Sequence, residues 1–160
     1  MLKTYGLIMK KYCLILFSFL FILLIINIIW LYHQNSKTPI LGLISNKLAP
    51  MPKTPNAISS QTQVLSKKVE PLHFKGSLEH SKEALITIIS NINGTELVEN
   101  DEQYLYFIFS TSLMKFKDDV EFYFDDEKKI IDIRSSSRAG YSDLGKNLER
   151  YEFIKQQWEK

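Results

Sequence analysis

The chain has 160 residues, with 20 Lys and Arg against 18 Asp and Glu, and a formal net charge of +2 at pH 7. Three of the lysines precede a long apolar run and every acidic residue follows it, so the portion after position 33 carries a net charge of 17 − 18 = −1. A nucleic-acid partner requires a basic stripe, and this near-neutral balance excludes that class of protein. The roughly 128 residues after the run suffice for one domain with a core, but not for two.

The apolar run extends from Cys13 to Tyr32 without a charged residue. At about 1.5 Å rise per residue, its twenty residues span the ~30 Å hydrocarbon core of a bilayer. The run closes on Trp30, Leu31 and Tyr32, and no Ala-x-Ala cleavage pattern follows, so an uncleaved anchor is favoured over a secretory signal peptide. The sequence therefore predicts a transmembrane helix over residues 12–32, with the lipid bilayer as a partner.

The lysines around this helix predict its orientation. Lys3, Lys10 and Lys11 precede the span and only Lys37 lies close behind it, which places residues 1–11 in the cytoplasm. We expect a single-pass protein of the inner (cytoplasmic) membrane with its C-terminal portion outside. Cys13 is the only cysteine, so the outer domain contains no disulfide.

All five prolines fall between Pro39 and Pro71, which predicts extended, meandering chain rather than regular structure. We assign residues 33–43 to a tether and residues 44–160 to an extracytoplasmic domain. Apolar residues recur through the proline-containing segment, so the chain beyond about Leu43 is expected to pack onto the domain.

The remainder predicts two helices around a sheet. Ser77 is a candidate N-cap, and Leu85 and Ile89 contribute to one apolar face of a helix that ends near Asn93-Gly94. A second helix starts near Ser142 or Asp143. Its expected apolar face consists of Leu144, Leu148, Tyr151, Ile154 and Trp158.

Between these helices lie four apolar or alternating runs that predict an antiparallel meander: Leu97-Val98, Tyr104 to Ser110, Val120 to Phe124 and Ile130 to Arg134. The predicted fold class is α+β, with an antiparallel sheet of about four strands and both helices on one face. The other face carries Tyr104, Tyr106, Ile108, Glu121 and Tyr123, an aromatic surface that requires a cover. The proline-containing segment, a partner or membrane lipid could each supply it.

One polar stretch between the last strand and the last helix is the candidate site, because arginine forks, hydroxyls and a helix N-terminus all favour anions. The candidate anion-binding residues are Arg134, Ser135, Ser136, Ser137, Arg138, Gly140, Ser142, Asp143, Asn147 and Arg150. The alternative is a structural corner, in which Arg134 pairs with Glu121 and Arg138 pairs with Asp118, Asp119 or Asp143.

Recognisable enzyme motifs are absent from the sequence. Asp118 and Asp119 are adjacent in a strand and point to opposite faces, so they cannot flank one substrate bond. His73 and His80 lie in different elements without further ligands, so no metal site is expected. No phosphate loop or dinucleotide fingerprint occurs, and we assign no catalytic residue and no cofactor.

Three stretches resemble the family called domain of unknown function 1499: residues 55–61, 116–122 and 134–147, within a resemblance that covers roughly residues 41–158. The resemblance implies a compact domain of bacterial or chloroplast origin and implies no activity. The family's usual Cys-Pro-x-x-Pro-Asn-Cys is replaced here by residues 51–57, Met-Pro-Lys-Thr-Pro-Asn-Ala. Any role that requires this cysteine pair is therefore excluded for this chain.

These observations favour a membrane-anchored, non-enzymatic binding or assembly module of the cell envelope, with an envelope protein or an anionic small molecule as its partner. One alternative is a hydrolase or transferase acting on anionic envelope material, in which Arg134 and Arg138 hold the anion and Asp143 or Asp119 is the base. That alternative requires the arginines to converge on an open pocket beside an unpaired carboxylate. Another alternative is a sensor of an anionic ligand, with an apolar pocket beside the loop that contains Ser135 to Arg138.

Overall fold

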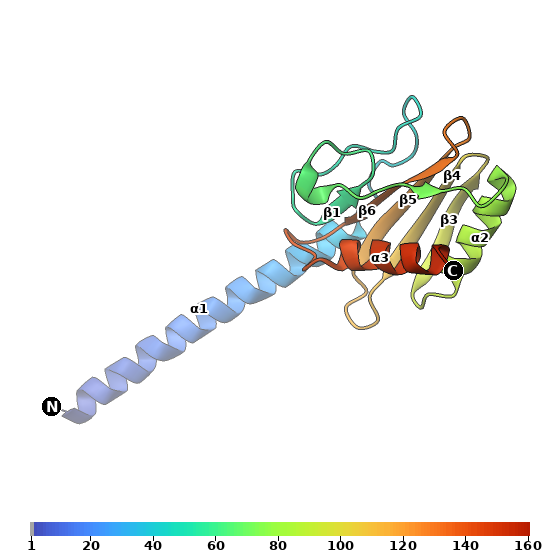
Figure 1. Cartoon of the computed structure of the whole chain (residues 1–160). Helices are drawn as coiled ribbons and strands as arrows, with labels where there is room; N and C mark the ends of the chain where they lie inside the picture. The colour runs from blue at the N-terminus through green and yellow to red at the C-terminus, as the bar shows by residue number, and fades with distance from the viewer. Residues whose placement is uncertain (1) are drawn as a thin grey trace.

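A computed structural model describes residues 2–160, so residue 1 of the predicted N-terminal segment lies outside the described residues. A single helix, α1 (Leu2–Ser36), leads into an α+β domain and projects away from it (Figure 1). Its portion Ile8–Ser36 is long and apolar enough to cross a membrane. The helix continues four residues beyond the predicted span, so residues 33–36 of the predicted tether are helical.

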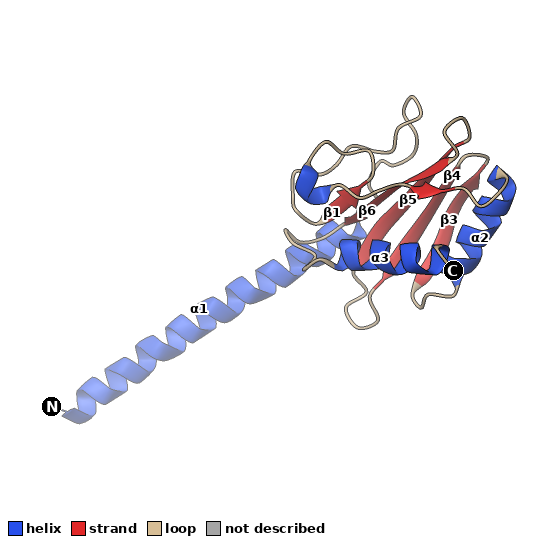
Figure 2. Cartoon of the chain, viewed as in Figure 1, coloured by secondary structure: helices blue, strands red, loops and turns tan. Residues whose placement is uncertain are grey.

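The domain is built on one antiparallel sheet of six strands (Figure 2). Four strands form the predicted meander: β3 (Thr95–Asp101), β4 (Tyr104–Ser110), β5 (Lys117–Asp125) and β6 (Ile130–Ser137). The short strands β1 (Ala57–Ser59) and β2 (Leu72–His73) both pair with β6. The sheet order is β1-β6-β5-β4-β3. The prediction of about four strands missed β1 and β2, because both are too short to show a period.

The main core lies between one face of the sheet and the two domain helices, α2 (Leu78–Ser90) and α3 (Lys146–Trp158). The inward residues of the three central strands follow the expected two-residue period and are all buried: Leu105, Phe107, Phe109, Val120, Phe122, Phe124, Ile131 and Ile133. Leu85 and Ile89 of α2 and Ile154 of α3 are fully buried against them. Both helices therefore cover the same face, as predicted.

The helix starts differ in how well the sequence predicted them. Ser77 caps α2, and its hydroxyl accepts from the backbone N–H of His80. The start of α3 was placed too early, because the helix begins at Lys146 rather than near Ser142 or Asp143. Leu144 has a φ of 55°, outside the helical region, and its side chain is 91% exposed. Leu148 is also exposed, so the prediction that these two leucines cover the sheet was wrong.

The opposite face of the sheet is covered by the proline-containing segment, one of the three covers that the sequence allowed. Leu48 is buried against Tyr104, Tyr106 and Tyr123, and Leu41 and Leu43 pack beside it. The chain beyond about Leu43 does pack onto the domain. The edge strand β3 is not covered in this way, because its last six residues are exposed.

Candidate functional site

The three stretches 55–61, 116–122 and 134–147 meet in the folded domain. They contribute β1, the first half of β5, and the end of β6 with the loop that leads to α3. Asn56 connects the first stretch to the third: its side-chain amide donates to the carbonyls of Ser137 (3.2 Å) and Gly140 (2.9 Å). Its own carbonyl accepts from the backbone N–H of Ser137 at 3.0 Å.

On the sheet face that the proline-containing segment covers, Arg138 is held by Asp119. Its Nε donates to both carboxylate oxygens, at 3.0 and 2.9 Å, and its Nη2 donates to Oδ1 at 2.7 Å. The hydroxyl of Tyr106 donates to the same carboxylate at 2.5 Å and accepts from Arg138 at 2.9 Å. The Arg138 side chain is only 3% exposed, and its Nε and Nη2 both bind within this cluster.

A second cluster of the same composition lies beside it. Arg134 donates to Glu121 Oε2 at 2.8 Å, and the hydroxyl of Tyr104 donates to Glu121 Oε1 at 2.9 Å. Glu121 also accepts from the backbone N–H of Gly42 at 3.1 Å, which joins the covering segment to the cluster. Within residues 2–160, the Nε of Arg134 is the one buried side-chain nitrogen or oxygen without a hydrogen-bond partner. The Arg134 side chain as a whole is 7% exposed.

The tyrosines of both clusters are affected by this environment. Burial raises the pKa of Tyr106, and its hydrogen bond to Asp119 acts in the same direction. Burial also raises the pKa of Tyr104, with the negative charge of Glu121 adding to the effect. The hydrogen bond to Asp119 raises the pKa of Arg138. Each cluster therefore keeps a neutral phenol, a carboxylate and a guanidinium together.

The third arginine, Arg150, lies on the other face of the sheet. Its Nη2 donates to Asp118 at 2.5 Å, and its guanidinium lies 4.6 Å from the centre of the Phe109 ring. Asp118 and Asp119 thus serve opposite faces, as their adjacency in a strand predicted. The side chain of Arg150 is 14% exposed, slightly more than those of Arg134 and Arg138.

Asn147 is the buried centre of the loop before α3. Its Oδ1 accepts from the Ser135 hydroxyl at 2.6 Å and from Arg150 at 2.7 Å. Its Nδ2 donates to the Asn56 carbonyl at 2.9 Å and to Asp143 at 2.7 Å. Asp143 also accepts from the backbone N–H of Asn147 at 2.8 Å, so it caps α3 where the N-cap residue, Gly145, has no side chain.

The ten candidate residues therefore form one continuous region but divide in accessibility. Arg134, Ser135, Ser136 and Asn147 are buried. Ser137, Gly140, Ser142, Asp143 and Arg150 line a cavity at the end of the sheet. Arg138 is closed off by Asp119 and Tyr106. The region therefore combines the buried ion pairs of Arg134 and Arg138 with residues that line an accessible cavity.

This arrangement does not meet the requirement set for a hydrolase or transferase. The carboxylates of Asp118, Asp119 and Glu121 each face an arginine, and Asp143 caps a helix. Within residues 2–160, no three His, Cys, Asp or Glu side chains come together in a way that could hold a metal ion.

The last turn of α1 is joined directly to this region. Asn35 is buried: its Nδ2 donates to the Lys115 carbonyl at 2.9 Å and its Oδ1 accepts from the Lys117 N–H at 2.7 Å. Gln34 accepts from the N–H of Gly140 at 3.2 Å. The ring of Tyr32 lies 5.8 Å from that of Phe116. The sequence placed two of these α1 residues in a tether, and no local pattern distinguishes them from solvated amides.

A cavity of about 380 Å³ lies where α1 meets the domain. Its wall combines Leu31 of α1 with the loop between β4 and β5 and the loop between β6 and α3. The apolar members include Leu31, Phe116, Ala139 and Leu144. The charged members are three cations, Lys117, Lys146 and Arg150, and two anions, Asp118 and Asp143.

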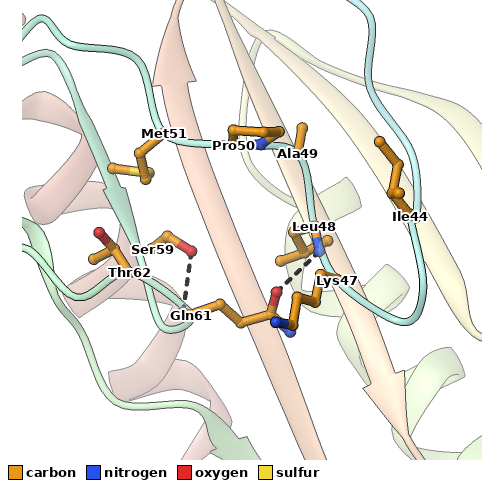
Figure 3. Close-up of a pocket in the computed structure, with 9 residues that line it drawn as sticks. All are labelled: Ile44, Lys47, Leu48, Ala49, Pro50, Met51, Ser59, Gln61 and Thr62. Atoms are coloured by element: carbon orange, nitrogen blue, oxygen red, sulfur yellow. Dashed lines mark hydrogen bonds between the residues drawn. The ribbon is translucent and has the colours of Figure 1, made fainter.

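A second cavity, of about 360 Å³, lies under the proline-containing segment (Figure 3). Ile44, Leu48 and Met51 supply apolar wall, and Ser59 and Thr62 supply hydroxyls. Gln61 shapes one side, because its Oε1 accepts from the backbone N–H of Leu48 at 2.9 Å. No charged side chain other than Lys47 lines this cavity.

Comparison with known proteins found one family model that matches the chain. The family model described as "Protein of unknown function (DUF1499)" matches residues 47–157, which include β1 to β6 and nearly all of α3. No curated protein and no solved structure matches the chain. The match covers well over half of the chain, so the protein belongs to the DUF1499 family of proteins of unknown function.

Proposed function

We propose that the protein is a single-pass protein of the cytoplasmic membrane. It holds a non-enzymatic binding module of the cell envelope against the outer face of that membrane. The observation that carries the proposal is the set of internal ion pairs: Arg134, Arg138 and Arg150 are each bound to a carboxylate. The conspicuous polar residues of the chain are therefore used to build the domain. Five of the ten candidate residues line the cavity beside α1, which is open to a ligand.

The membrane part of the proposal rests on α1. The helix is 35 residues long, every residue from 8 to 30 is exposed, and its last turn is hydrogen-bonded to the domain. A helix that is apolar all round and not covered by protein is suited to lipid. The direct junction leaves the domain next to the bilayer instead of at the end of a long tether.

The test of anchoring and orientation is a fusion of a periplasm-active reporter after Lys160, expressed in a Gram-negative host. We expect an active reporter that stays in the membrane pellet after alkaline carbonate extraction. A chain that lacks residues 2–36 is the control and should leave the pellet. An inactive reporter, or a soluble active product from the full chain, would overturn the proposal.

The non-enzymatic part is tested with the full chain in detergent micelles. Soluble phosphorylated and carboxylated compounds should leave the midpoint of thermal unfolding unchanged, because the guanidinium groups of Arg134 and Arg138 are enclosed. A compound that raises the midpoint in the native chain and not in the Arg138→Lys variant would instead show an open anion site, and would revive the hydrolase alternative.

A further inference from the structure

The loops that join the strands of the meander differ in polarity between the two ends of the sheet. At the end distant from α1, the turns after β3 and β5 consist of Glu102-Gln103 and Asp126-Glu127-Lys128-Lys129. At the end that meets α1, the loops between β4 and β5 and between β6 and α3 carry four exposed apolar side chains: Leu113, Met114, Tyr141 and Leu144. Both apolar loops lie on the side from which α1 leaves the domain (Figure 1).

The position of α1 fixes the depth of these loops. The apolar run of α1 ends at Tyr32, and Trp30 and Tyr32 have the amphipathic rings that gather at a bilayer surface. Tyr32 contacts Phe116, and Leu31 lines the cavity. Asn35 holds Lys115 and Lys117 within about one helical turn of that level. A bilayer crossed by α1 up to this level would therefore have its lipid headgroups beside the cavity and the loop between β4 and β5.

Exposure of such side chains in water is unfavourable, by about 25 cal/mol per Å² of apolar surface. Leu113 is 87% exposed, Leu144 is 91% exposed and Tyr141 is 74% exposed. The charge at this end also fits an acidic membrane surface. Lys115 and Lys117 have no ion-pair partner within residues 2–160, whereas Lys146 pairs with Glu149.

We propose that this end of the domain is a lipid-binding surface: the two apolar loops insert into the outer leaflet, and the cavity between them and α1 binds one acidic phospholipid. The acyl portion packs on Leu31, Phe116 and Leu144, and the phosphate lies beside Lys117. Asp118 and Asp143 do not repel it strongly, because Arg150 neutralises the first and Asn147 donates twice to the second. This inference rests on the proposed function, since the bilayer must be the one that α1 crosses.

Insertion is tested with the full chain in lipid nanodiscs. In a Cys13→Ser background, a cysteine is introduced by Leu144→Cys and labelled with an environment-sensitive fluorophore. The matched control is Glu127→Cys, an exposed position in the turn at the opposite end of β5. We expect nitroxide-bearing lipid to quench the label at position 144 at least several-fold more than the label at position 127. Equal quenching at both positions would overturn the insertion.

The lipid class is tested by thermal unfolding of the delipidated full chain in neutral detergent. Phosphatidylglycerol at about 100 times its dissociation constant should raise the midpoint by about 5 °C or more. Phosphatidylcholine should raise it much less, and inorganic phosphate should not raise it. The Lys117→Gln variant should unfold at the native midpoint without lipid and lose the response to phosphatidylglycerol.

Each remaining outcome is decisive. An equal response to inorganic phosphate would replace the lipid with a soluble anion and overturn the inference. An equal response to both lipids would also overturn it. If the carbonate-extracted pellet retains the chain while position 144 is not quenched, the anchor stands and only this inference fails. If the chain is not in the pellet, the proposed function itself fails.

Discussion

Arg138 and Asp119 form a forked ion pair that joins the loop between β6 and α3 to β5. The Nε and Nη2 of Arg138 make three contacts of 2.7–3.0 Å with the two carboxylate oxygens, and both side chains are almost completely buried. A planar fork that is matched to a carboxylate in this way gives geometric specificity as well as attraction. The pair fixes the direction in which the chain leaves β6, and this places the loop that lines the cavity beside α1.

Removal of one member of this pair should destabilise the domain. The Arg138→Ala substitution leaves Asp119 charged and buried, and breaking such a pair from one side costs about 3–5 kcal/mol. Arg138→Lys keeps the positive charge but loses the forked guanidinium, so its unfolding midpoint should lie between those of the native chain and Arg138→Ala. The measurement is the unfolding midpoint of the full chain in detergent. The control is Lys129→Ala, whose exposed pair with Asp126 should contribute less than about 1 kcal/mol. Equal effects of Arg138→Ala and Lys129→Ala would contradict this role.

The raised pKa values of Tyr104 and Tyr106 predict a loss of stability in alkali. A tyrosine whose pKa is higher in the folded state contributes a stability that is fully present below its unfolded pKa, near 10. That stability is lost as the pH rises from there towards the folded pKa, because the unfolded chain releases the proton first. The free energy of unfolding should therefore fall above about pH 10, and the fall should be shallower in Tyr106→Phe.

This titration can be followed directly by the absorbance of phenolate. Tyr104 and Tyr106 are buried, so their ionisation should be delayed beyond the ordinary pKa of a phenol. The two buried tyrosines should ionise together with unfolding. Ionisation of all the tyrosines in a single early step, while the domain remains folded, would show that the phenols are not enclosed by the carboxylates.

Gly94 offers a controlled test of packing between α2 and the sheet. It has a φ of +83°, and a Cβ added to it would lie 2.5 Å from the carbonyl oxygen of Ser110. Gly145 has nearly the same φ, +81°, but open space around the added atom. Gly145→Ala should cost only the backbone strain, about 1–2 kcal/mol. Gly94→Ala should cost the same strain and the clash in addition. Its free energy of unfolding should therefore be lower than that of Gly145→Ala by about 1–3 kcal/mol. Equal costs would show that the approach of Ser110 is not a packing constraint.

The parts of the fold that sequence alone predicted are those with a strong period. β4 begins and ends where its alternation predicted, from Tyr104 to Ser110, and Leu85 and Ile89 of α2 enter the core at the predicted spacing. The short strands β1 and β2 carry no such signal, because two or three residues cannot display an alternation. Leu144 was misplaced for a different reason. Its spacing fits a helix. Asp143 caps α3, however, and the chain between Asp143 and the start of α3 is a loop in which Leu144 has a left-handed backbone conformation.

The candidate site was predictable in part. The pairing of Arg134 with Glu121 was predicted as a cross-strand contact, and Asp119 was one of three partners proposed for Arg138; both pairs are present. The role of Asn147 as a buried centre could not be derived, because its partners come from residues up to 91 positions away. The role of Asn35 could not be predicted either, because its contacts depend on how α1 meets the loop between β4 and β5. Long-range polar contacts leave no periodic trace in a sequence.

The junction between α1 and the domain depends on Asn35, and this leads to the last prediction. Its side chain bonds the Lys115 carbonyl and the Lys117 N–H at once, so Asn35→Ala removes both bonds and leaves the start of β5 open. A hydrogen bond of this kind contributes about 1 kcal/mol, so the amide of Lys117 should exchange with deuterium roughly 5- to 30-fold faster. Ser36→Ala is the control, because Ser36 is exposed and bonds only within the helix, to His33. Hydrogen exchange of the full chain in nanodiscs measures both variants. If exchange at Lys117 is unchanged in Asn35→Ala, the helix and the domain are not joined at this point, and the loops beside α1 would not be held at the membrane surface.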